Sequence, residues 1–149
     1  MAHPLSKIRL FAGLSDEQLD AIEGAGERRK YAAGDTLFTE GEEGTHVYCL
    51  VSGRVELSVA MSDQTEQVPV HVATVGSVFG EFVLFEQRPR SATARAVRGA
   101  HVLAVTAEDM HAAFVADPAA GYVVMHNLCN ILVERMRKTT GELRASLMW

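Results

Sequence analysis

The strongest constraint on the fold is a run of short, strand-like segments between residues 27 and 106, which are separated by glycines or polar turns. The expected strands are residues 27–32, 35–39, 46–52, 54–61, 67–75, 91–97 and 101–106. The expected turns contain Gly34, Gly41, Gly44, Gly53, Ser62–Asp63, Gly76 and Gly99. Many short strands at nearly regular spacing predict an all-β jelly roll or a small barrel.

Helices are expected on both sides of these strands. Within residues 1–26, Ser15 and Gln18 have the spacing of a capping box. After the strands, Thr106 is a suitable N-cap, and Asp117-Pro118 marks the start of a second helix. We therefore divide a single 149-residue domain into a helical segment 1–26, a β segment 27–106 and C-terminal helices 107–149.

The last helix has an apolar repeat along its length. The repeat steps by three and four residues through Met125, Leu128, Leu132, Met136, Thr139, Leu143 and Leu147. This spacing is typical of the contact face of a two-stranded coiled coil. A helix of almost 30 residues spans about 45 Å, more than one small barrel covers. We expect a homodimer through this helix; packing on the chain's own barrel is the alternative.

Charge and cysteine content exclude several classes of protein. The formal net charge of −5 gives no general attraction to nucleic acids or anionic membranes. There is no apolar run long enough to span a bilayer and no signal peptide, so no membrane association is expected. Cys49 and Cys129 stand far apart with no CxxC motif, which indicates a reducing, cytoplasmic location.

The segment 78–96 combines the groups that bind a phosphorylated sugar. Gly80-Glu81 is expected to open a short helical turn whose free N–H groups suit a phosphate. Arg90 adds two parallel donors for the same anion, and Glu81 can accept hydrogen bonds from sugar hydroxyls. The alternative is that Arg90 pairs with Glu81 or Glu86 and holds the loop without a ligand.

This segment resembles the phosphate-binding cassette of cyclic nucleotide-binding domains. The matching positions are Phe79, Gly80, Glu81, Leu84, Pro89, Arg90, Ser91, Ala92 and Ala96, and the segment Leu10–Leu19 resembles the family's N-terminal helical motif. The resemblance implies that Glu81 binds the ribose 2′-hydroxyl, Arg90 and Ser91 bind the phosphate, and backbone N–H groups near Phe82 and Ala92 assist. Val83 and Ala94 depart from the usual residues, and the bulk of Val83 is expected to lower affinity or reshape the site.

The last helix resembles the dimer helix of the bacterial cAMP receptor proteins, in which an R-L-x-x-T-S run faces the adenine. Arg135-Met-Arg-Lys-Thr-Thr140 matches that run, and the resemblance assigns Thr139 and Thr140 to the adenine, one of them from each subunit. The expected ligand-binding residues are therefore Phe79, Gly80, Glu81, Phe82, Val83, Arg90, Ser91, Ala92, Thr139 and Thr140. The chain stops at Trp149, so no helix-turn-helix domain and no direct DNA binding are expected.

Catalytic and metal sites are not expected. A cupin metal site needs an H-x-H motif, which is missing, so His71 and His101 are interpreted as ordinary barrel residues. The expected fold is mainly β, an antiparallel β-roll or jelly roll with an N-terminal helix, a short cassette helix and a long C-terminal dimer helix. The expected function is a standalone cAMP sensor with no cofactor and an unknown effector protein; alternatives are a ligand-free structural module or a sensor of cGMP or cyclic di-GMP.

Overall fold

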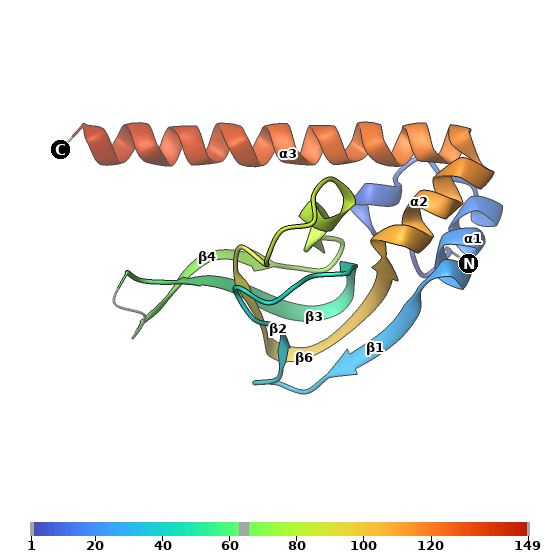
Figure 1. Ribbon diagram of the computed structural model, residues 1–149. Helices are drawn as coiled ribbons and strands as arrows, with labels where there is room; N and C mark the ends of the chain where they lie inside the picture. The colour runs from blue at the N-terminus through green and yellow to red at the C-terminus, as the bar shows by residue number, and fades with distance from the viewer. Residues whose placement is uncertain (1, 63–65, 149) are drawn as a thin grey trace.

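A computed structural model of the chain describes residues 2–62 and 66–148. Residue 63, in the expected turn after Ser62, and Trp149 lie outside the described residues. Figure 1 shows a curved sheet with the last helix running along one side of it and the shorter helices gathered at one end. The strands are β1 Glu27–Tyr31, β2 Thr36–Phe38, β3 His46–Ala60, β4 Gln67–Ala73, β5 Val78–Phe79 and β6 Thr93–Thr106. The helices are α1 Asp16–Ala25, α2 Ala107–Ala116 and α3 Pro118–Leu147, with 3₁₀ turns η1 Arg9–Phe11 and η2 Glu81–Leu84.

The strands form one antiparallel sheet in the order β1-β6-β3-β4, with β2 also against β6 and β5 against β3. This confirms the expected β-roll. The prediction of separate strands on either side of Gly53 was wrong, because β3 continues through it from residue 46 to residue 60. Gly53 has a φ of 92°, and the β3–β6 register shifts around it. The glycine therefore bends a continuous strand, and β6 likewise joins the expected strands 91–97 and 101–106.

Side chains cap the helices as the sequence predicts. The Gln18 N–H donates to the Ser15 hydroxyl at 3.2 Å, and the Ser15 N–H donates to the side-chain Oε1 of Gln18 at 2.9 Å, which completes the capping box. The Thr106 hydroxyl accepts from the Asp109 N–H at the start of α2. Asp117 caps α3, and Pro118 occupies its first turn. These caps fix where each helix leaves the sheet.

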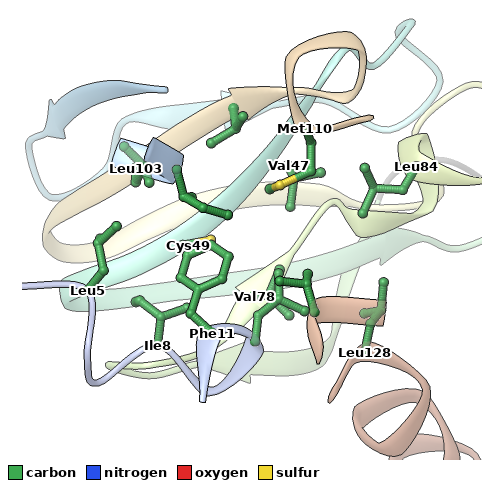
Figure 2. Packing of buried hydrophobic residues seen from close by; sticks show 14 of the residues in the cluster. Leu5, Ile8, Phe11, Val47, Cys49, Val78, Leu84, Leu103, Met110 and Leu128 are labelled. Carbon is green, nitrogen blue, oxygen red and sulfur yellow. The ribbon is translucent and has the colours of Figure 1, made fainter. Parts of the chain in front are cut away.

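Two buried clusters form the core. One fills the space between the sheet and the helices and includes Phe11, Cys49, Met110 and Leu128, which Figure 2 shows converging from η1, β3, α2 and α3. The other lies inside the β-roll and includes the rings of Phe38, Tyr48 and Phe79. Since α3 contributes to the first cluster, the start of that helix is held firmly against the sheet.

The apolar residues of α3 divide between two faces. One face is buried in the protomer: Ala120, Val124, Leu128 and Ile131. Leu128 has no exposed surface, so its assignment to the dimer contact face was wrong. Other apolar side chains remain exposed: Tyr122, Val133, Met136, Leu143 and Leu147. The homodimer remains a prediction that this exposed face supports. Among the described residues, no helix is long and apolar enough to cross a membrane.

Candidate functional site

A cavity of about 560 Å³ opens between the sheet, η2 and α3. Its walls come from β2, β3, β4, the segment 80–92 and one side chain of α3. The polar and charged side chains of the lining are Glu81, Glu86, Arg88, Arg90, Ser91 and Arg135. The apolar lining includes Phe38, Leu57, Val70, Phe82 and Val83. A cavity with an apolar wall and a few charged groups is typical of a small-molecule site.

Arg90 is buried, with only 8% of its surface exposed, and its guanidinium is fixed from several sides. Its Nη2 donates to the His46 carbonyl at 2.8 Å, and its Nη1 donates to the Gly80 carbonyl at 3.2 Å. The guanidinium carbon lies 4.2 Å from the centre of the Phe38 ring, within cation–π range. Burial lowers the pKa of Arg90, but the guanidinium stays charged at neutral pH. Within the described residues its buried Nε–H has no acceptor. The geometry therefore supplies a fixed positive charge for an anion.

Two glycines make room for this guanidinium. A Cβ on Gly44 would lie 2.4 Å from Nε of Arg90, and a Cβ on Gly80 would lie 2.7 Å from its Nη1. Gly80 also has a φ of 71°, in the left-handed region that favours glycine. The glycine in the cassette motif thus has a packing role beside its conformational one.

Glu81 lies at the start of η2, is only 4% exposed and pairs with Arg135 of α3. Arg135 also donates from Nη2 to the Val78 carbonyl at 2.7 Å. A buried carboxylate requires a compensating charge, and α3 provides it. The alternative pairing of Arg90 with Glu81 or Glu86 does not occur: the recorded partners of Glu81 and Glu86 are Arg135 and Arg88.

The role of Arg135 in the site was not predicted from the sequence. It is absent from the expected ligand-binding residues, because charged residues surround it on α3 as on a solvent-exposed face. It follows the buried Leu128 by seven residues and Ile131 by four, so it lies on the face that packs on the barrel. The helical period, extended past the apolar residues, would have located it.

The expected ligand-binding residues occupy three environments. Most line the cavity: Gly80, Glu81, Phe82, Val83, Arg90, Ser91 and Ala92. Phe79 instead lies in the core of the β-roll, where its ring stacks on Tyr48 at a centroid distance of 5.4 Å. Thr139 and Thr140 are exposed on α3 and do not line this cavity within the described protomer. Their role toward a base remains a prediction that requires a second subunit.

The histidines do not form a metal site in the described part of the chain, where no three potential ligands gather. His71 and His101 lie on β4 and β6, and His46 lies beside the Arg90 site. Burial, with the charges of Arg29 and Arg90, lowers the pKa of His46. The ring of His46 therefore favours the neutral form. Its backbone carbonyl separately accepts a hydrogen bond from Arg90.

Known proteins share these features. A family model described as the cyclic nucleotide-binding domain matches residues 28–117. The cyclic AMP receptor protein of Thermus thermophilus is 34% identical over 134 residues, which are 90% of this chain and 60% of that protein. The chain thus spans about 60% of the length of that relative.

Solved structures agree with the family match. The crystal structure of the Thermus thermophilus catabolite activator protein superposes with a TM-score of 0.80 and 32% identity, covering 91% of this chain and 62% of that one. A cyclic nucleotide-binding domain from Methylobacillus flagellatus has a TM-score of 0.83 at 20% identity over 96% of this chain and 80% of its own, and shows the shared fold. The chain belongs to the cyclic nucleotide-binding domain family and is homologous to the cAMP receptor proteins.

Proposed function

We propose that this chain is a sensor of cyclic nucleotides and that its ligand is cAMP. It would work as a homodimer and signal the presence of the ligand to a protein partner. The observation that carries the proposal is that one cavity contains a buried arginine, Arg90, and a buried glutamate, Glu81. A cyclic nucleotide offers the matching groups, a charged phosphate and a ribose hydroxyl. Similarity to a protein named cyclic AMP receptor protein supports cAMP within this class.

The phosphate would bind at Arg90, because its guanidinium is fixed by two carbonyls and by the Phe38 ring before any ligand arrives. Such preorganisation lowers the entropy cost of binding. Ser91, which also lines the cavity, would donate its hydroxyl to the same anion. Glu81 would accept from the ribose hydroxyl with the oxygen that Arg135 does not hold.

Signalling would use the contact between the cavity and α3. Arg135 contacts Glu81 and the Val78 carbonyl, so one side chain connects the ribose site to the long helix. A ligand that changes the partners of Glu81 has different affinities for different positions of α3. This difference in affinity is sufficient for the ligand to shift the populations of those positions. The effector protein would recognise the position of the helix.

Dimerisation would occur through the exposed apolar face of α3, which includes Met136 and Leu143. In such a dimer Thr139 or Thr140 of one subunit would approach the base bound by the other. Met136→Glu places a charge in this face and is expected to give a monomer in light scattering, whereas Arg137→Glu, on the next exposed position, leaves the mass unchanged. A dimer that persists in Met136→Glu would contradict this interface.

The test of ligand binding is calorimetric titration of nucleotide-free protein with cAMP, cGMP and cyclic di-GMP. Arg90→Ala is expected to weaken cAMP binding by about 2–5 kcal/mol, the cost of removing one member of a buried charge pair. Arg88→Ala is the matched control, because Arg88 lines the same cavity with a largely exposed side chain. It should change the affinity by less than about 1 kcal/mol.

A second candidate function is a structural module that binds no nucleotide. One observation favours it: both charged residues already have protein partners, Glu81 at Arg135 and Arg90 at two backbone carbonyls. In that case no nucleotide binds the empty protein, and Arg90→Ala lowers only the melting temperature. Saturable binding that disappears in folded Arg90→Ala would instead reject the structural module.

A further inference from the structure

The outer face of the sheet carries a group of basic side chains where β1, β6 and β3 pair. We propose that this surface binds an acidic segment of a partner protein, independently of the nucleotide cavity. In Figure 1, α3 runs along one side of the β-roll, and β1 and β6 form the opposite side. We define the basic sheet surface as Lys30, Arg54, Arg95, Arg98 and His101.

The strand register brings these residues together. Arg54 of β3 is directly opposite Arg98 of β6, and Lys30 of β1 is directly opposite His101 of β6. Val55 and Ala96 are fully buried, so alternation directs their chain neighbours Arg54 and Arg95 outward. The register shift between Arg54 and Val55 leaves Arg98, opposite Arg54, exposed as well. Directly opposed residues have Cβ atoms about 5 Å apart, so the members of each pair lie close together. Arg95, Arg98 and His101 follow at intervals of three residues along β6.

The backbone under this surface is held closely. Gly53 lies immediately before Arg54, and a Cβ there would lie 2.2 Å from the Gly99 carbonyl oxygen. β3 and β6 therefore approach so closely at this point that a side chain at position 53 would not fit. The sheet therefore fixes the backbone positions of Arg54 and Arg98, which lowers the entropy cost of binding a partner.

The arrangement is unfavourable for the isolated chain. Two arginines directly opposite each other on one face of a sheet repel. The ion pairs recorded among the described residues do not include Lys30, Arg54, Arg95 or Arg98, all of which are exposed. Glu56, opposite Arg95, offsets one of the positive charges. A bound carboxylate-rich segment would relieve the remaining repulsion.

The size and surroundings of the surface favour a short peptide segment over a nucleic acid or a membrane. Lys30 and the three arginines carry four positive charges on a chain of net charge −5, so the rest of the chain carries −9. A long polyanion would extend onto that acidic remainder, whereas a short segment would not. Exposed Val97 lies between Ala96 and Arg98 on β6 and offers an apolar contact, which a peptide side chain can use.

The test is fluorescence anisotropy of a fluorescein-labelled deca-glutamate peptide with the full chain. We expect saturable binding at low salt that weakens as salt rises. Arg54→Glu converts the repelling pair with Arg98 into an attracting one. It should therefore weaken peptide binding about tenfold while raising the melting temperature by about 1–3 °C. A purely structural role for Arg54 would not move these two quantities in opposite directions.

Arg144→Glu is the matched control, because it makes the same charge change at an exposed position near the end of α3. Peptide affinity should stay within about twofold of the parent value. Equal weakening by both variants, or no saturable binding by the parent chain, overturns the proposal. Tighter binding of a DNA duplex or of phosphatidylserine vesicles than of the peptide overturns the choice of partner. Titration of each variant with cAMP keeps failure here distinct from failure of the nucleotide site.

Discussion

Removing Arg135 should destabilise the protein because it leaves the carboxylate of Glu81 buried without a partner. Glu81 is 4% exposed, and loss of one partner of a fully buried pair costs about 3–5 kcal/mol. The Arg135 side chain is 34% exposed, so water can enter the space that it leaves. We therefore expect Arg135→Met to lower the free energy of unfolding by about 2–3 kcal/mol, or the melting temperature by about 5–10 °C.

The reverse change should be milder. In Glu81→Gln the amide oxygen can still accept from Arg135, which keeps its bond to the Val78 carbonyl and its contact with water. The expected loss is about 1 kcal/mol. The double variant should lose little more stability than Glu81→Gln alone, since no buried carboxylate remains for Arg135 to neutralise. The two single losses together then exceed the loss in the double variant by about 2 kcal/mol, which is the expected coupling energy.

The assay is urea denaturation of the four proteins of this cycle at one protein concentration, so that dimerisation does not alter the comparison. Arg137→Met, two residues further along α3 and exposed, is the control and should change stability by less than about 0.5 kcal/mol. Equal losses for Arg135→Met and Glu81→Gln, with no coupling, would refute the assignment of Arg135 as the charge partner of Glu81.

Three further predictions concern packing and pH. Gly44→Ala should displace the Arg90 guanidinium and lower stability by about 1–3 kcal/mol, whereas Gly141→Ala, which meets no atom within 4 Å on α3, should raise it by about 0.5–1 kcal/mol in the same thermal melts. Leu128→Ala should cost about 2–5 kcal/mol in urea denaturation and leave the mass in light scattering unchanged, because Leu128 lies outside the proposed dimer face. Burial and nearby cations on α3 lower the pKa of His71 below its unfolded value of 6.5. Below about pH 6.5 the unfolded chain then binds more protons than the folded one, so the free energy of unfolding should decrease as the pH is lowered. His71→Gln should make this decrease smaller in urea midpoints measured from about pH 7.5 to 5.

Local sequence features predicted those parts of the site that lie close together along the chain. The cassette residues Gly80, Glu81 and Arg90 fall within one short loop and line one cavity, as expected. The helix caps at Ser15 and Thr106 were predictable for the same reason, because each depends on a bond to a residue three positions away. Such interactions require no knowledge of the tertiary fold.

The errors concern choices that the sequence leaves open until elements pack together. Leu128 and Leu132 both fit an apolar repeat, but only the packing of α3 on the sheet shows that Leu128 is buried in the protomer. Gly53 was expected to end a strand, because a glycine between two strand-like runs usually marks a turn. Here the ladder to β6 continues across it with a register shift, so the same residue bends the strand.

The most informative error is Arg135, because it concerns how the site is built rather than where it lies. Its partner Glu81 is 54 residues away, and neither residue has a local signal for the other. The buried carboxylate of Glu81 needs a cation beside it, and Arg135 reaches it because α3 packs next to η2. Glu81 therefore belongs both to the cavity and to the contact between the β-roll and the long helix. Any ligand that binds Glu81 acts on that contact directly, which makes the ion pair the shortest physical connection between ligand binding and the position of α3.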